Sequence, residues 1–229
     1  MYKLKFIVLL SFISTLLFGQ KSISIEGSLG GGLRMLEYST YNNPMLGSLD
    51  DNFFFNEVLL SVNFYSKNDL NRLSFSIGHS LQYLTIRREL TTGEYKDNSL
   101  FYFTSIGMGY RRYFSKDTKS RFYCEGRLSV GYPYGLTMNS ETTVDGVVVD
   151  NESVPFESHP AFSHFLTLHF KADLGIGYSF ILNSPKSINR NILIFNTFFG
   201  AFHSNTFFRQ GQMLGGTFNV GIEYRFRRR

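Results

Sequence analysis

The sequence predicts an all-β protein, an eight-stranded antiparallel transmembrane β-barrel arranged as an up-and-down meander. Three observations predict it. Apolar and polar residues alternate along about eight segments, the segments are too long for an ordinary globular sheet, and the connections between them are short and long in turn. Alternation with a period of two is typical of a strand with one apolar face. An even number of strands can close a sheet without leaving a free edge.

The composition excludes several other classes of protein. Of the 229 residues, 43% are hydrophobic and 17% are aromatic, which is too apolar for a disordered chain. The single cysteine excludes a disulfide scaffold and the usual zinc cages. Removing Lys3 and Lys5 with the leader described below leaves 21 of the 23 basic residues against 18 acidic ones. This net charge of +3 is too small to indicate a nucleic-acid partner.

The first 19 residues have the pattern of a cleaved export signal. Lys3 and Lys5 precede an apolar run from Phe6 to Phe18, and Gly19 is a small residue before the expected cut. The apolar run is too short to cross a bilayer as a helix, which needs about 20 residues. We therefore expect residues 1–19 to be a signal peptide and residues 20–229 to form the barrel domain.

Each predicted strand has an apolar face and a face of small and charged residues. The alternation is most regular from Leu166 to Phe180, where Lys171 and Asp173 lie on the polar face. In 190–203 both faces are apolar, so the register of that strand is left open. The predicted strands span residues 22–36, 53–66, 72–88, 99–114, 121–138, 166–180, 190–203 and 214–226.

Two kinds of fold bury such strands. A soluble sandwich or lipocalin-like barrel turns the apolar face inward, whereas a membrane barrel turns it outward. Predicted strands of roughly 13 to 17 residues exceed the usual globular length of about 5–6 and suffice for the ~9–11 that cross a tilted bilayer. The polar face is rich in Gly and Ser and carries charges of both signs, which favours a packed lumen over a soluble surface.

The connections predict the orientation of the barrel. The short connections are 67–71, 115–120 and 181–189, and the long ones are 37–52, 89–98 and 139–163, with 204–213 of intermediate length. Short periplasmic turns and longer outer loops are typical of outer-membrane barrels, so both termini are expected on the periplasmic side. The predicted inner edge has an aromatic girdle of Phe64, Phe75, Tyr110, Phe114, Phe122, Tyr178, Phe180, Tyr224 and Phe226.

The last strand carries a motif that resembles a known family. The alternating residues Phe218, Val220, Ile222, Tyr224 and Phe226 look like the carboxy-terminal signal read by the barrel-assembly machinery. The chain thus resembles the small eight-stranded outer-membrane β-barrel family of Gram-negative bacteria, although Arg227, Arg228 and Arg229 follow the terminal aromatic. The resemblance implies insertion by that machinery and contact with lipid and lipopolysaccharide. It indicates architecture rather than activity.

Charged residues on the inward face are the main candidate site. A catalytic interpretation would combine a carboxylate pair with His169 as an acid/base site. An eight-stranded lumen holds only side chains and buried charges must pair, so we favour an ion-pair plug, which also argues against a wide pore. The expected plug residues are Glu26, Arg34, Glu57, Arg111, Glu125, Arg127, Lys171, Asp173, Glu223 and Arg225.

A hydrolytic site near the outer rim is the enzyme alternative. Small barrels of the lipid A deacylase family carry a His and a Ser on one strand face, near an acidic residue. Here His203 and Ser204 are adjacent, so in a regular strand they point to opposite faces. No complete Ser/His/acid set can be assigned without a bulge.

The remaining histidines and the cysteine have simpler interpretations. His159, His164 and His169 recur every five residues, an odd step that alternates faces in a strand, so no metal site is expected. Cys124 falls on the lipid-facing side and is expected to act as a small apolar residue.

The outer connections carry the remaining candidates. Residues 139–163 contain five acidic residues and no Lys or Arg, and Asp145-Gly146 within them predicts a hairpin that extends the flanking strands beyond the membrane. This acidic loop could bind a divalent cation or a basic partner, although a solvated loop is the simpler interpretation. Arg34, Arg87, Arg88 and Arg209 are predicted at outer strand ends, where they could contact lipopolysaccharide phosphates.

We therefore expect a monomeric outer-membrane barrel with no cofactor, no metal and no catalysis. Its role is expected to be structural or interactive, carried by outer loops that meet lipopolysaccharide, surface ligands or other proteins. The alternatives are a lipid A-modifying hydrolase, an accessory of a secretion or envelope system, and a narrow pore. The sequence does not choose between adhesion, envelope integrity and secretion.

Overall fold

The computed structural model describes residues 20–37, 52–90, 93–116, 119–155, 168–183, 189–204 and 211–227. The predicted signal peptide, 1–19, lies outside them. In this part of the chain there is no helix that could cross a membrane. The described strands are β1 (Gln20–Glu37), β2 (Asn52–Ser66), β3 (Asn71–Leu90), β4 (Gly93–Tyr113), β5 (Ser120–Val144), β6 (Val147–Pro155), β7 (His169–Ile181), β8 (Arg190–Ser204) and β9 (Gly211–Arg227).

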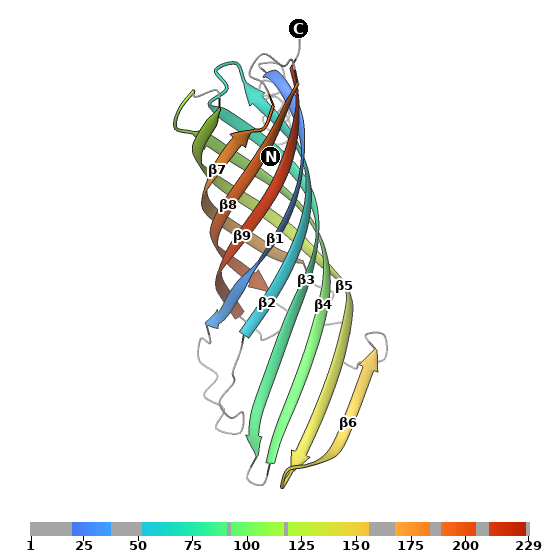
Figure 1. The fold of residues 1–229 in the computed structure, drawn as a ribbon. Helices are drawn as coiled ribbons and strands as arrows, with labels where there is room; N and C mark the ends of the chain where they lie inside the picture. Colours follow the sequence, from blue (N-terminus) through green and yellow to red (C-terminus); the bar gives the residue numbers. More distant parts are fainter. Residues whose placement is uncertain are drawn as a thin grey trace, which may run out of the picture.

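Eight of these strands close a barrel (Figure 1). The sheet order is β4-β3-β2-β1-β9-β8-β7-β5, and β4 also pairs with β5, which joins the two ends of the sheet. All neighbouring strands are antiparallel. β6 pairs with β5 outside the closed ring. The predicted all-β, eight-stranded antiparallel meander is confirmed, with β6 as an additional hairpin strand.

The two ends of the barrel differ. At one end, which we call the turn end, Ser22 of β1 lies beside Arg227 of β9, and short connections join β2 to β3, β4 to β5 and β7 to β8. The predicted aromatic girdle lies near these strand ends, where Phe122 packs on Tyr178 at 4.7 Å between ring centroids and Tyr224 packs on Phe226 at 4.8 Å. The outward exposure of Phe122, Tyr224 and Phe226, at 65%, 39% and 44%, is consistent with such a belt.

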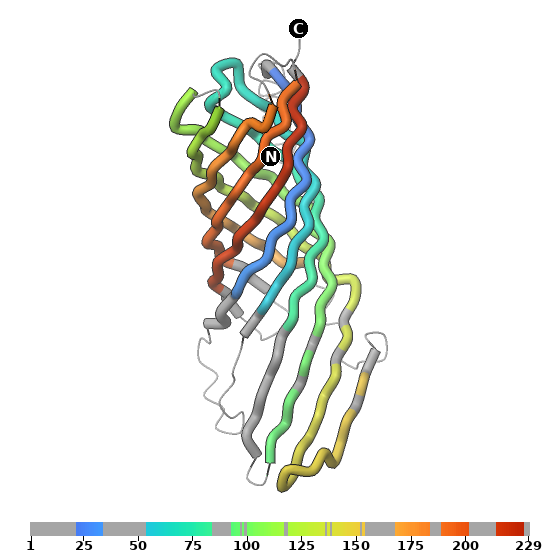
Figure 2. The backbone as a smooth tube through the Cα atoms, viewed as in Figure 1, coloured from blue at the N-terminus to red at the C-terminus, as the bar shows by residue number. Residues whose placement is uncertain are grey.

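At the opposite end, a sheet made of the outer parts of β3, β4, β5 and β6 continues beyond the barrel (Figure 1). We call it the projecting sheet. Figure 2 shows the same extension for β5 and β6. β3 pairs with β4 as far as Leu90 and Gly93, and β4 pairs with β5 as far as Val144. The expectation of a long loop at 89–98 is therefore wrong, because β3 continues to Leu90 and β4 begins at Gly93, and only 91–92 between them lie outside the described residues. A sheet that is wetted on both faces needs no alternation, so its polar strands resemble a loop in sequence.

The predicted Asp-Gly hairpin forms the tip of the projecting sheet. Asp145 and Gly146 have φ values of 49° and 80°, the left-handed conformations that a two-residue hairpin turn requires. Val144 pairs with Val147 on either side of the turn. The hairpin extends β5 as predicted, whereas β7 begins only at His169, and residues 156–167 lie outside the described part of the chain.

The structure also gives the register that residues 190–203 leave open. In β8 the side chains of Ile192, Ile194, Asn196 and Phe198 are buried in the lumen. Their neighbours Phe195 and Phe199 point outward, with 37% and 64% of their surface exposed. Near the turn end, β8 thus presents Ile192 and Ile194 to the lumen.

Candidate functional site: the charged lumen

The two faces of the barrel wall are inverted relative to a soluble protein. The outward side chains are apolar and exposed, as with Leu174 at 75% and Ile176 at 69%, whereas inward charged residues such as Glu26 and Arg111 are 1% and 0% exposed. A closed barrel that buries charge and exposes leucine has lipid as its outer solvent. The chain has the architecture of a small outer-membrane β-barrel.

The centre of the lumen holds a cluster of three carboxylates and three guanidinium groups, which we call the charge cluster: Glu26, Glu125, Glu223, Arg72, Arg111 and Arg127. Arg72 contacts all three carboxylates. It donates to Glu26, lies 3.2 Å from Glu223 Oε2 and 3.3 Å from Glu125 Oε1. Glu125 also accepts from Arg111 Nε at 2.6 Å and Arg127 Nε at 2.8 Å. The formal charges balance, as buried charges must.

The strand register explains why these charges need one another. Glu26 of β1 lies directly beside Glu223 of β9, and Arg72 of β3 lies directly beside Arg111 of β4. Like charges at directly opposed positions on one face are destabilising. Here the pair of glutamates faces the pair of arginines across the lumen, and the guanidinium of Arg72 bridges Glu26 and Glu223. Pairing across the lumen therefore converts two repulsive cross-strand pairs into one neutral network.

Between the charge cluster and the turn end lies a layer of stacked arginine and tyrosine side chains. Arg111 lies over the ring of Tyr123 at 3.9 Å, Arg121 over Tyr113 at 3.9 Å, and Arg225 over Tyr65 at 3.7 Å. Such cation–π contacts are strongest where water is excluded. The three tyrosine side chains are at most 1% exposed and pack with Ile181, Ile192 and Ile194.

The turn between β2 and β3 is hydrogen-bonded to arginines of this layer. Asp69 adopts a left-handed backbone conformation with φ 60°. Its carboxylate accepts from Arg225, and its carbonyl accepts from Arg121 Nη1 at 2.9 Å. Tyr65 Oη, at the end of β2, donates to Glu223 Oε1 at 2.5 Å, which joins the layer to the charge cluster. The lumen is therefore filled continuously from the turn into the centre of the barrel.

A second group of charges lies farther along the strands towards the projecting end. Lys171 Nζ lies 3.3 Å from Glu57 and 3.0 Å from Asp173. The aromatic side chains Phe55, Phe101 and Phe103 are buried in the lumen, and the ring of His169 packs against Phe103 at 4.9 Å. The described residues hold no cluster of His, Cys, Asp or Glu suited to a metal ion.

Most of the residues expected in the lumen plug fall into these two groups. The charge cluster contains Glu26, Arg111, Glu125, Arg127 and Glu223, and the second group contains Glu57, Lys171 and Asp173. Arg225 pairs instead with Asp69 at the turn end. The backbone of Arg34 lies in β1 beside Phe53 and Gly215, but its side chain lies outside the described part of the structure.

Several other candidate residues also lie wholly or partly outside the described residues. The backbones of Arg87 and Arg88 belong to β3, and those of His203 and Ser204 belong to β8, but their side chains are not described. Arg209, His159 and His164 fall in undescribed segments. Of the residues expected to form the assembly signal, the described side chains of Phe218, Val220, Ile222, Tyr224 and Phe226 all point outward and are 37–60% exposed.

The sequence interpretation missed several residues that complete the lumen. Arg72 precedes Ser74 by two positions, Tyr65 follows Asn63 by two, Tyr113 follows Arg111 by two, and Tyr123 precedes Glu125 by two. Extending each predicted inward face by one period would have included all four. Asp69 lies in a turn, where alternation carries no signal.

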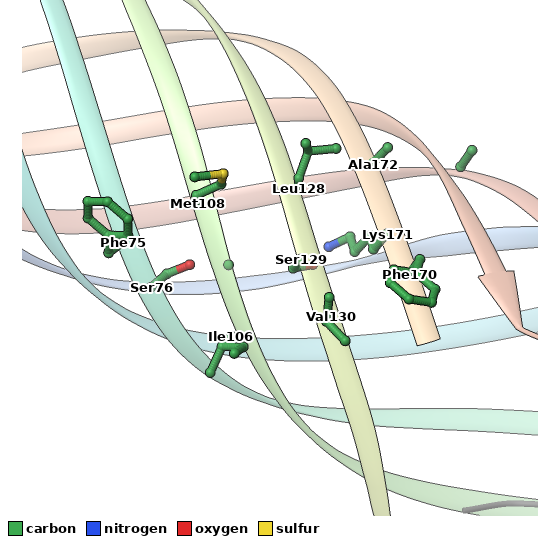
Figure 3. A pocket seen from close by; sticks show the side chains of 12 residues that line it. Phe75, Ser76, Ile106, Met108, Leu128, Ser129, Val130, Phe170, Lys171 and Ala172 are labelled. Carbon is green, nitrogen blue, oxygen red and sulfur yellow. The ribbon is translucent and has the colours of Figure 1, made fainter. Parts of the chain in front are cut away.

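The outer wall contains an apolar groove of about 780 Å³ across β3, β4, β5, β7 and β8 (Figure 3). It lies between two rows of outward side chains, Phe75, Met108 and Leu128 on one side and Ile106, Val130 and Phe170 on the other. The paired residues Ala172 of β7 and Ala201 of β8 also line it. An apolar groove on an exposed wall suits acyl chains better than a water-soluble ligand.

Comparisons with known proteins return similar solved structures and no family. No protein-family model matches the chain, and no curated protein is significantly similar to it. Similar solved structures include Neisserial surface protein A, with 9% identity over 90% of this chain and 97% of that one and a TM-score of 0.44. OprG from Pseudomonas aeruginosa has 10% identity over 92% and 98% of the two chains and a TM-score of 0.39.

The outer membrane protease OmpT from Escherichia coli has 7% identity over 90% of this chain and 97% of that one, with a TM-score of 0.41. At these TM-scores the comparisons add nothing to the architecture, which the strand register establishes by itself.

Proposed function

We propose that the protein is an integral barrel of the Gram-negative outer membrane with a sealed lumen and a non-catalytic, structural or interaction role. The observation that carries this proposal is the packed lumen. Arg72, Arg111 and Tyr65 in its centre are at most 1% exposed, and the Asp69 turn is bonded across the turn end. A lumen filled in this way supports neither a diffusion pore nor a substrate channel.

The difference between the two ends supports an orientation. Short turns and the ends of β1 and β9 lie together, as expected for the periplasmic side. The projecting sheet then stands outside the cell. Contact of Arg87, Arg88 and Arg209 with lipopolysaccharide, and insertion by the barrel-assembly machinery, remain predictions of the same proposal.

The interaction role is supported by the projecting sheet. β5 extends to Val144, thirteen residues beyond its last pairing with β7 at Gly131. The strands of this sheet carry exposed polar residues and exposed valines rather than a lipid-facing apolar surface. No described strand pairs with the outer edge of β6 or with segment 86–90 of β3, and such edges can pair with the strand of a partner.

The sealed lumen predicts that the full-length protein forms no channel. Inserted into a planar lipid bilayer, the purified protein is expected to give no stable single-channel current steps, because the charge cluster and the arginine–tyrosine layer leave no aqueous path. Insertion is checked in the same preparation by the change in gel migration between unboiled and boiled samples. Reproducible current steps from the folded protein would refute the sealed lumen.

A further inference from the structure

Among the described residues, the projecting sheet has two edges that pair with no further strand. On one side, β2 pairs with β3 only as far as Asn52 and Thr85, so the segment 86–90 of β3 has no described strand beside it. On the other side, β6 pairs with no described strand other than β5. Free edges present unpaired backbone N–H and C=O groups, which can bind another strand.

The edge formed by β6 is acidic and has a high strand propensity. Val147, Val148 and Val149 are 64%, 51% and 59% exposed. They are followed by Asp150 and Glu152, which lie two residues apart and pair with Thr142 and Ser140 of β5. β-branched residues favour strand pairing. Residues 139–163, which include this whole edge, have no Lys or Arg to balance the acidic charge.

The edge formed by β3 carries the opposite charge. The segment 86–90 contains Arg87 and Arg88 with a single acidic residue, Glu89, and therefore has a net charge of +1. Its neighbours on β4 are of both signs, with Lys96 opposite Arg87, Glu94 opposite Glu89 and Asp97 opposite Ile86. Opposite charges on adjoining strands favour pairing, and like charges oppose it. The acidic edge of β6 and the net positive segment 86–90 of β3 thus carry opposite charges, while two β6 edges would repel each other.

The directions of β3 and β6 allow these two edges to pair between two copies in one membrane. β3 runs away from the barrel and β6 runs back towards it (Figure 1). Two copies inserted with the same orientation therefore bring β6 of one and β3 of the next together as antiparallel strands. Pairing two β6 strands about an axis normal to the membrane would be parallel and would oppose acidic residues.

We propose that the partner of the β6 edge is the 86–90 edge of a second copy of this chain. The proposal rests on the proposed function, because it requires barrels that share one membrane orientation. It revises the expected monomer to a row of barrels joined outside the membrane. A head-to-tail contact of this kind uses different surfaces on the two copies, so it can extend from copy to copy.

Energy transfer between labelled barrels in liposomes tests this proposal. The label is placed in the short turn between β4 and β5 by Lys116→Cys, far from both edges, with Cys124→Ala removing the native thiol. Donor- and acceptor-labelled protein is refolded together into liposomes that contain no lipopolysaccharide. Transfer is expected to fall when unlabelled protein is added at a constant density of label, because unlabelled copies replace labelled neighbours.

Reversing the charges on β6 and on segment 86–90 of β3 tests whether these two edges form the contact between copies. Asp150→Lys with Glu152→Lys, or Arg87→Glu with Arg88→Glu, is expected to reduce transfer to the level seen with unlabelled excess. Both pairs of changes in one chain should restore it. Asp145→Asn, at the tip of the same hairpin and outside β6, is the matched control and should leave transfer unchanged.

Two results would overturn the proposal. Transfer that does not respond to unlabelled protein would show that copies do not associate, and an extended basic segment of another protein would then be the occupant to test. If the chain with both pairs of changes shows energy transfer as low as the variants with one pair, these two edges do not form the contact between copies. Failure of the labelled protein to show heat-dependent gel migration would instead count against the membrane barrel itself.

Discussion

Replacing Arg72 with methionine is expected to lower the free energy of unfolding of the barrel by about 3–5 kcal/mol, the usual cost of removing one partner from a buried ion pair. The side chain of Arg72 is 1% exposed and contacts the carboxylates of Glu26, Glu125 and Glu223. Methionine fills similar space but leaves Glu26 and Glu223, which are direct neighbours, without the cation that bridges them. Urea unfolding of protein refolded into lipid vesicles measures the loss.

Two further variants separate charge from packing. Arg112→Met changes the same residue type on the adjacent strand, where Arg112 is exposed and donates to Asn71 Oδ1 at 2.8 Å, so little change is expected. Adding Glu26→Gln and Glu223→Gln to Arg72→Met should recover part of the loss, because neutral amides no longer require a cation. Equal stability of Arg72→Met and Arg112→Met would contradict the role given to the charge cluster.

Leu174→Arg is expected to destabilise the barrel by roughly 2–4 kcal/mol, the cost measured for basic residues on the lipid face near the middle of a membrane barrel. Leu174 is 75% exposed in the middle of β7. In a soluble protein, a substitution at so exposed a site would change stability by less than about 0.5 kcal/mol. The measured loss therefore reports which solvent the leucine faces.

Val148→Arg is the matched control for this substitution. Val148 is also apolar and exposed, at 51%, but it lies on the projecting sheet. An unchanged free energy of unfolding is expected there, because water surrounds that sheet. Equal, small effects at both sites would indicate that β7 also faces water.

The barrel itself could be predicted from alternation, but its projecting sheet could not. Within the membrane, lipid and lumen impose opposite solvents on successive residues, and the period-two pattern of β3, β5 and β7 records this. Beyond the membrane both faces meet water, so residues near Arg88 and Lys96 show no pattern although they are paired in strands. In β8, Ile192 and Ile194 face an apolar part of the lumen, which removes the contrast between its faces.

The sequence predicts that the lumen contains paired charges, but it does not predict which charges pair with one another. Inward charges of both signs indicate a paired lumen, and the alternation places Glu26, Glu125 and Glu223 there. Which charges pair depends on how eight strands shear around the barrel, which no single strand encodes. The partnership of Arg225 with Asp69 depends on a turn conformation as well.

Fluorescence quenching of a single tryptophan, in protein refolded into lipid vesicles, tests most directly whether lipid surrounds the outer wall of the barrel. The natural chain contains no Trp, so Leu174→Trp introduces one probe on the outer wall and Val148→Trp introduces one on the projecting sheet. A lipid-facing wall predicts that bromine atoms on the acyl chains quench Trp at position 174 but not at 148, and that aqueous acrylamide does the reverse. Strong quenching at 174 by acrylamide, with none by brominated lipid, would contradict the membrane barrel.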